Sequence, residues 1–261
     1  MLHNCCRKEA ERRHVDQERL HLQDRYFFDP PEFLTMLYKG GPPGEPQPKR
    51  HEHWGYFRDD PTSLPQFIAH CSDAREGKMT IASASLFGAL HKMLLACKDT
   101  VLATKMESFC KTNGVSLTSK HVTYGARKRK LECVASTFNG LGIVVDCDKD
   151  VGYRPLGVEA KELWKDLDSI ANHGGDTKKL RELINWSSIA NDESDFGNSL
   201  ELGIDLFSSF PRFTKTARKV LSTSYTLLGR DVFCDIITLH CSERTHNPVN
   251  MFDEEKKVKD S

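Results

Sequence analysis

The chain has 261 residues, of which 38% are hydrophobic and 28% charged. These proportions are ordinary for a globular protein long enough to bury a core, and no apolar run approaches the roughly 20 residues that span a bilayer. Basic and acidic residues number 37 each, so no net field drives non-specific binding to nucleic acid or membrane. We therefore expect no membrane contact and no direct sequence-specific nucleic-acid binding.

The cysteines and the two ends of the chain give a first organisation. Nine cysteines without a C-x-x-C pair predict reduced, intracellular thiols, and the charged residues 1–25 lack the apolar core of a secretory signal. We expect a charged N-terminal arm over 1–24, a domain over 25–249 in one lobe or in two with a boundary near 150, and a charged tail over 250–261.

Strand-like segments fill the first third of the chain. Aromatic and branched residues from Tyr26, ahead of Asp29-Pro30-Pro31, predict a strand that closes in a turn. The glycines and prolines of residues 40–48 predict a loop. Three more short strands are predicted at residues 54–57, 67–71 and 79–82.

The period of the apolar residues changes in the middle of the chain. Residues 83–111 carry apolar side chains at three- and four-residue steps, which predicts one long helix with a serine cap and an end at Asn113-Gly114. Residues 121–147 return to strand character on both sides of Asn139-Gly140, a dipeptide that favours a hairpin turn.

The second half of the chain is mostly helical by its spacing. The predicted helices cover residues 159–172, 178–186, 213–228 and 231–241. Residues 189–207 differ, because alternating leucine and isoleucine favour a strand there, although Leu200, Ile204 and Phe207 would also suit one helix face. The fold class is thus α+β: a mostly antiparallel sheet from segments between Tyr26 and Val145, packed helices, and a helical C-terminal part.

Three carboxylates, Asp192, Glu193 and Asp195, lie beside the turn-forming residues Gly197 and Asn198. The simpler interpretation is a solvated turn or a helix cap. The alternative is that repulsion among neighbouring negative charges makes one carboxylate a better proton acceptor near neutral pH.

A second candidate site is the segment Val151-Gly152-Tyr153-Arg154-Pro155. Glycine permits a sharp turn, and arginine carries a permanent cation that can bind a carboxylate with two hydrogen bonds. The alternative is an exposed Arg154 stacked on Tyr153.

Other charged and metal-ligating groups carry weaker signals. Residues 127–130 (RKRK) could contact phosphates, direct nuclear import or form a charged hairpin edge. His51 with His53, and Cys5-Cys6 near His3, lack further ligands at zinc-site spacing, so we expect no metal. Neither a glycine-rich phosphate loop nor a G-x-S-x-G elbow occurs, which argues against a self-sufficient enzyme.

Three stretches together resemble the histone PARylation factor family. They are YFFDPPEF with the following HWGYFRDDP, then DVGYR, then ANDESDFGNSLELGIDLF. The similarity extends from about residue 20 to about residue 245. Family members usually begin with a further helical portion, which a short charged arm ending near Asp24 replaces here, so we expect apolar surface to be exposed.

The resemblance implies a function in the nucleus, on chromosomes at sites of DNA damage. It implies docking on the catalytic domain of poly(ADP-ribose) polymerases activated at DNA breaks, to complete a shared active site that modifies serine in histones and other targets. NAD would be bound by the polymerase, and this chain would have no cofactor of its own. Two alternatives stay open: a non-catalytic paralogue that still binds the polymerase or histones, and an independent hydrolase acting through Asp192 and Glu193.

The resemblance also implies roles for individual residues. Glu193 matches the catalytic glutamate, and Asp192 occupies the adjoining acidic position that supports the site. Arg154, with Tyr153 beside it in GYR, matches the arginine used around the polymerase contact, and Asp195 lies where the motif keeps an acid. Because a serine hydroxyl is a weak nucleophile at neutral pH, a base supplied by this chain could redirect transfer to serine.

Overall fold

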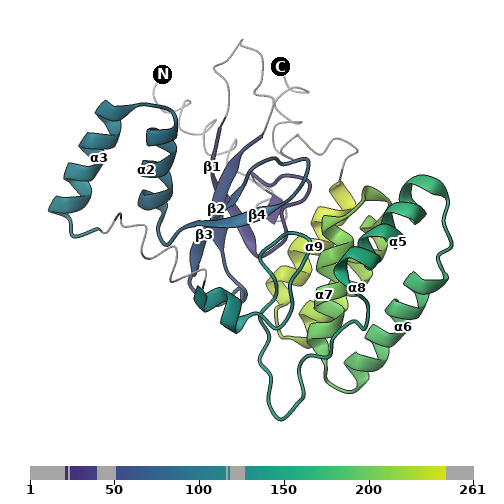
Figure 1. Ribbon diagram of the computed structural model, residues 1–261. Coiled ribbons are helices and arrows are strands. Elements are labelled where there is room, and N and C mark those ends of the chain that lie inside the picture. Colours follow the sequence, from purple (N-terminus) through teal and green to yellow (C-terminus); the bar gives the residue numbers. More distant parts are fainter. Residues whose placement is uncertain (1–20, 23, 40–50, 116, 118–126, 245–261) are drawn as a thin grey trace, which may run out of the picture.

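The computed structural model describes residues 21–22, 24–39, 51–115, 117 and 127–244. Its sheet contains β1 (Phe33–Tyr38), β2 (His53–Phe57), β3 (Phe67–Cys71) and β4 (Met79–Ser83), in that order and antiparallel throughout. Its helices include α2 (Leu86–Ala96), α3 (Thr100–Thr112), α5 (Ala160–His173), α6 (Lys178–Asp192), α7 (Phe196–Ser208), α8 (Thr214–Leu227) and α9 (Asp231–Glu243). The sheet lies between the pair α2–α3 and the group α5–α9, which confirms the α+β class (Figure 1).

The strands form because alternate side chains find two different apolar surfaces. On one face Trp54 and Ile68 pack against Ala89 of α2. On the other face the aromatic and sulfur-containing side chains of the sheet pack against Leu141. Gly55 has no space for a side chain, since an added Cβ would lie 2.2 Å from the carbonyl oxygen of Leu34. The short strands predicted at residues 54–57, 67–71 and 79–82 are therefore confirmed.

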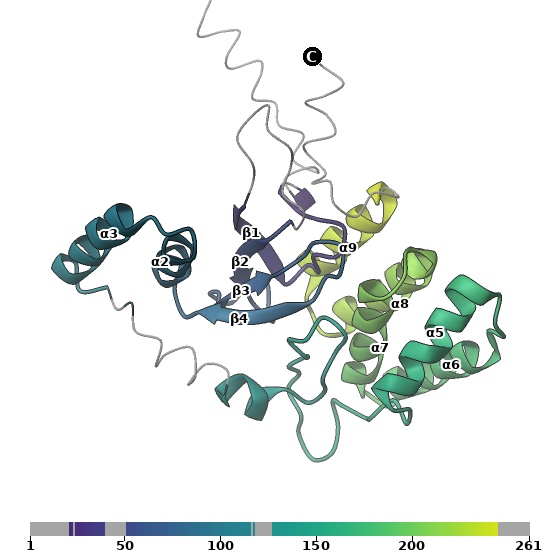
Figure 2. The same cartoon turned by 45° about the horizontal axis from the view of Figure 1, so that its top comes forward.

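The largest core lies in the helical part, around α7. Buried side chains from the 135–145 segment and from the helices α5 to α9 meet there. Figure 2 shows α7 beside α8, with α5 and α6 on the far side from the sheet. The predicted helices over residues 159–172, 178–186, 213–228 and 231–241 are confirmed, and α6 extends to Asp192.

Buried polar contacts join the residues before the sheet to the helical part. Tyr225 donates to Glu32 Oε1 at 2.8 Å. Arg244 donates to the carbonyl oxygens of Phe27 and Phe207, and its guanidinium lies 3.9 Å from the centroid of each ring. A hydrogen bond to a charged group is worth about 1.5–3 kcal/mol, so these contacts fix the sheet against α7 and α8.

The strand predicted to start at Tyr26 is wrong, because this segment forms turns and the first strand begins after the two prolines. The buried guanidinium of Arg25 donates to the carbonyl oxygens of Pro30 and Phe33 at 2.8 and 2.5 Å. Asp29 accepts from the Tyr26 backbone N–H at 3.0 Å. Side-chain hydrogen bonds therefore replace the expected strand ladder.

The single helix predicted over residues 83–111 is two helices, α2 and α3. Its serine cap is confirmed, since Ser85 accepts from the Gly88 N–H. The break occurs where Lys98 takes a left-handed φ of 60° and Asp99 caps the next helix by accepting from Leu102 N–H at 3.0 Å. Apolar spacing continues through this turn, which is why the sequence did not reveal the break.

The hairpin predicted over residues 121–147 is also wrong in its described part. Residues 127–132 are helical, and one isolated antiparallel bridge, Ala135 with Ile143, surrounds the Asn139-Gly140 turn. The predicted sheet accordingly ends at β4 rather than near Val145. The charged hairpin edge is excluded for residues 127–130, because they lie on a helix turn whose third residue, Arg129, is buried.

The strand favoured over residues 189–207 is instead the end of α6 and the whole of α7. Eleven of the thirteen residues of α7 are buried, including Ser199 and Asp205, so the helix has no solvated face that would show a 3.6-residue period. Its buried polar groups are hydrogen-bonded, as when Ser224 donates to Ser199 Oγ at 2.7 Å. The alternative helix face of Leu200, Ile204 and Phe207 was the correct one.

Candidate functional site

The acidic triplet lies at the tight connection between α6 and α7. Asp192 is the last residue of α6, Glu193 is its C-cap, and Asp195 is the N-cap of α7. Ser194 has a φ of +66°, and the Asp195 N–H donates to the Ala190 carbonyl at 2.8 Å, which closes the helix in a Schellman-type turn. The turn brings Glu193 and Asp195 to one cation, Arg154, and leaves Asp192 exposed.

Arg154 binds two of the three carboxylates. Its Nη2 lies 2.5 Å from Glu193 Oε2 and 2.9 Å from Asp195 Oδ2. The Glu193 side chain is 53% exposed, whereas that of Asp195 is 5% exposed. Hydrogen bonding to Glu193, together with the charge of both carboxylates, raises the pKa of Arg154. One cation thus offsets part of the negative charge of two carboxylates, while Asp192 is exposed and takes no part in either contact.

Hydrogen bonds of the Gly152 backbone hold the loop that carries Arg154 against the start of α7. The Gly152 N–H donates to Asp195 Oδ1 at 3.1 Å, and the Gly197 N–H donates to the Gly152 carbonyl at 2.8 Å. Gly152 has a φ of +111°, and an added Cβ would lie 2.3 Å from the Asp146 carbonyl oxygen. The glycine is therefore required where the loop crosses the start of α7.

A buried amide completes this support. Asn198 donates to the Arg154 carbonyl at 2.8 Å and accepts from Ser187 Oγ at 2.7 Å. Ser187 belongs to α6 and Asn198 to α7, so one side chain connects both helices to the loop. Arg154 and Glu193, 39 positions apart in the sequence, are held together by elements that are themselves rigidly connected.

Tyr153, predicted as a partner contact, directs its hydroxyl toward α7. It is half-buried and donates to Glu201 Oε2 at 2.9 Å. Burial raises the pKa of Glu201 to about 7, against the opposing effect of this hydrogen bond. Burial also raises the pKa of Asp205 to about 8, although the Phe138 N–H donates to it at 2.8 Å. Burial thus moves the pKa of two carboxyls of α7 toward neutral pH, and one of them, Glu201, is bound by Tyr153 of the Arg154 loop.

This burial predicts a pH-dependent stability. The folded pKa of Asp205 lies above its unfolded value of about 4, so its contribution is most favourable below pH 4 and is lost as the pH rises to about 8. We expect Asp205→Asn to flatten the fall in free energy of unfolding between pH 5 and 8. At pH 8 it should stabilise the protein by up to about 5 kcal/mol, the cost of a pKa shift of about four units. Urea unfolding at both pH values measures this.

The exposed Asp235→Asn on α9 is the matched control for this experiment. It removes the same charge from a solvated position and should leave the pH slope unchanged. An Asp205→Asn variant that keeps the wild-type slope would contradict the assignment of the slope to this buried carboxyl.

The predicted absence of a metal site concerns two sets of residues. In the first, His53 is buried and its Nε2 lies 2.8 Å from Asp29 Oδ1, which places it in a hydrogen-bonded core pair. Within the described ranges, no group of three or more histidine, cysteine, aspartate or glutamate side chains could hold a metal ion. The second set, Cys5-Cys6 with His3, lies outside the described residues.

No helix in the described part is long and apolar enough to cross a membrane.

Sequence reasoning found the charged residues of the site but missed the groups that place them. Asn198 and Asp205 were not identified as site residues, because a buried polar side chain has no signal in apolar spacing. The sequence did offer one sign: polar residues recur through residues 198–205 among leucines, where a fully buried helix must satisfy each of them.

The fold and the site define an α+β protein that presents an arginine-bound carboxylate on the surface of its helical part. The family model for histone PARylation factor 1 matches residues 3–244. The chain therefore belongs to the histone PARylation factor 1 family, which confirms the resemblance found in the three sequence stretches.

Individual relatives support this membership over most of the chain. It is similar to histone PARylation factor 1 of Bos taurus, with 33% identity over 245 residues, 87% of this chain and 68% of the relative. The protein of that name from Danio rerio is 34% identical over 249 residues, 88% of this chain and 69% of the relative. The one from Mus musculus is 32% identical over 247 residues, 87% and 68% respectively.

Proposed function

We propose that this chain is a nuclear accessory factor that completes the active site of DNA-damage-activated poly(ADP-ribose) polymerases and directs ADP-ribosylation to serine in histones. The observation that carries the proposal is the half-exposed Glu193 carboxylate at the α6–α7 turn, in a chain of this family. NAD in this reaction would be the polymerase's ligand. The carboxylate would be the contribution of this chain.

The proposed reaction needs a base because a serine hydroxyl is protonated at neutral pH. Glu193 would accept the hydroxyl proton while the serine oxygen bonds to the anomeric carbon of the nicotinamide ribose and nicotinamide leaves. An exposed position suits a base that must reach into another protein's pocket. The rigid support under the turn suits it too, since a misplacement of about 1 Å can cost a hundredfold in rate.

We infer for Arg154 a second role beside the partner contact that the resemblance implies. In the chain alone its guanidinium binds Glu193 Oε2, one of the two carboxylate oxygens that could accept the serine proton. Docking could resolve this competition, if an acidic group of the polymerase binds the guanidinium and leaves Glu193 accessible. Arg154 would then both bind the partner and release the base, while Asp195 keeps the loop in place through Gly152.

Substitution of Arg154 separates binding from folding. Arg154→Ala should weaken association with the polymerase catalytic domain by about tenfold or more, since interface arginines often dominate binding energy. The melting temperature should fall only modestly, because the guanidinium is half exposed and the buried Asp195 keeps its hydrogen bond from the Gly152 N–H. Calorimetric titration measures the affinity. Lys165→Ala, an exposed cation on α5, is the control; equal affinities for both variants would contradict the role of Arg154.

A reconstituted transfer assay tests the function itself. The purified chain, a DNA-activated polymerase, NAD and a histone peptide should give serine-linked ADP-ribose, and the same peptide with serine replaced by alanine should not be modified. Binding to the polymerase without serine transfer would instead favour the non-catalytic alternative. Turnover of NAD by the chain alone would favour the independent hydrolase.

A further inference from the structure

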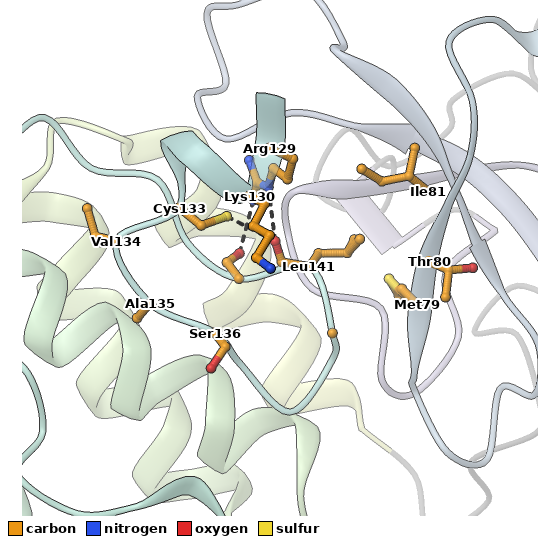
Figure 3. A pocket seen from close by; sticks show the side chains of 12 residues that line it. Met79, Thr80, Ile81, Arg129, Lys130, Cys133, Val134, Ala135, Ser136 and Leu141 are labelled. Atoms are coloured by element: carbon orange, nitrogen blue, oxygen red, sulfur yellow. Dashed lines mark hydrogen bonds between the residues drawn. The ribbon is translucent and has the colours of Figure 1, made fainter. Parts of the chain in front are cut away.

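A groove between β4 and the segment of residues 129–142 has no part in the proposed function. It has a volume of about 560 Å³ and lies between β4 and the 129–142 segment. Figure 3 shows Met79, Thr80 and Ile81 on one wall and the residues from Arg129 to Ser136 on the other. This volume can hold several residues of an extended peptide.

The β4 wall is the open edge of the sheet. The strand order places β4 last, with β3 as its one strand neighbour in the described sheet. Hydrogen bonds in an antiparallel ladder alternate in direction along a strand. The Met79 N–H points away from β3, since it donates to the Asn139 carbonyl at 2.7 Å. Ile81, two residues on, therefore directs its N–H and C=O into the groove.

The Asn139 contact and a bulge limit the part of β4 with which a further strand can pair. Asn139 already occupies the first position along this edge. The register shift between Ile68 and Ala69 marks a bulge near Ala82, beyond which the edge no longer continues regularly. A peptide would thus pair with the short stretch around Ile81, between the Asn139 contact and the bulge.

The walls of the groove indicate which side chains it would accept. Its apolar surface comes from Met79, Ile81, Val134 and Leu141. The half-buried Cys133 donates its Sγ hydrogen to the Leu141 carbonyl, and burial raises its pKa, so the thiol stays protonated and unreactive. This surface suits branched apolar side chains at alternate positions of an extended chain.

The charges at the groove favour an acidic ligand. Among the described residues that line it there is no aspartate or glutamate, and the cations are Arg129 and Lys130. The Arg129 guanidinium is already bound by Asp59 and by the carbonyls of Leu141 and Gly142. Lys130 is exposed and its side chain extends toward the gap between the walls (Figure 3). One cation at the groove is therefore available to a partner.

We propose that this groove binds an extended acidic peptide segment of a partner protein, which adds to the edge of β4 as a further strand. Backbone pairing at Ile81 would supply affinity, the apolar walls would select alternate branched residues, and Lys130 would select a carboxylate. The site is independent of Glu193 and of the proposed serine transfer.

A random octapeptide library displayed on phage, selected on the full chain, tests the proposal. We expect enrichment of peptides with branched apolar residues at alternate positions and at least one acidic residue. The enriched peptide, labelled for fluorescence anisotropy, should bind Lys130→Glu at least tenfold more weakly than wild type. Ser136→Trp, which fills the groove from an exposed position, should have the same effect. Lys128→Glu, exposed on the same helical turn and outside the groove, should bind as wild type does.

Backbone pairing is tested with N-methylated versions of the same peptide. Methyl groups on alternate amides in one register should abolish binding, and those in the other register should not, because strand addition uses every second N–H. Equal effects in both registers would overturn strand addition. The proposal would be overturned by enrichment of peptides without acidic residues, or by peptide binding that Ser136→Trp leaves unchanged. Tighter binding of oligodeoxythymidine than of the peptide would also overturn it.

Discussion

Glutamine in place of Glu193 should reduce serine ADP-ribosylation by about a hundredfold to ten-thousandfold, the usual contribution of a general base. Glutamine keeps the length of the side chain and an oxygen that Arg154 can bind, but it cannot accept the hydroxyl proton. The initial rate of transfer to a histone peptide, at a concentration of the chain that saturates the polymerase, measures the effect. Association with the polymerase should be unchanged.

Two other variants make the result specific to position 193. Asp192→Asn removes the neighbouring carboxylate, which is exposed and lies outside the Arg154 contacts, and should have a much smaller effect on the rate. Asp235→Asn, on α9, should have none. Serine transfer that continues at the wild-type rate with Glu193→Gln would exclude this carboxylate as the base.

The chemistry-bearing residues could be named from the sequence because they occur in local motifs. Glu193 lies in a run of acidic residues and Arg154 in a glycine-containing turn. Their direct contact could not be predicted, since it depends on how α6, α7 and the Gly152 loop pack. The same holds for Tyr153, whose hydroxyl is bound by a helix residue 48 positions away.

The fold shows the same limit. The short strands at residues 54–57 and 67–71 were predictable as short runs of aromatic and branched residues, although burial on both faces leaves them no clear two-residue period. Helix α7 was mistaken for a strand because burial on all sides removes the difference between its faces. A sequence pattern reports on solvent contact, so it is least informative at the centre of a core.

Loss of the buried Arg129 side chain should strongly lower the free energy of unfolding, because Arg129 joins the sheet to the segment that follows it. Arg129 is paired with Asp59, both side chains are less than a tenth exposed, and its guanidinium lies over the Phe57 ring. Arg129→Leu leaves a buried carboxylate and the Leu141 carbonyl without this donor, and should cost about 3–5 kcal/mol in urea unfolding. The exposed Lys128→Leu should change stability by about 0.5 kcal/mol or less.

A second substitution at Asp59 distinguishes the stranded charge from lost packing. If the cost arises mainly from the unpaired carboxylate, Asp59→Asn should recover part of the stability lost in Arg129→Leu, so that the double variant is more stable than the sum of the two single changes predicts. Additive losses would assign the effect to packing on Phe57 and Phe67 instead. Because residues 59 and 129 lie 70 positions apart, a large coupling would show that this long-range pair stabilises the packing of the 129–142 segment on the sheet.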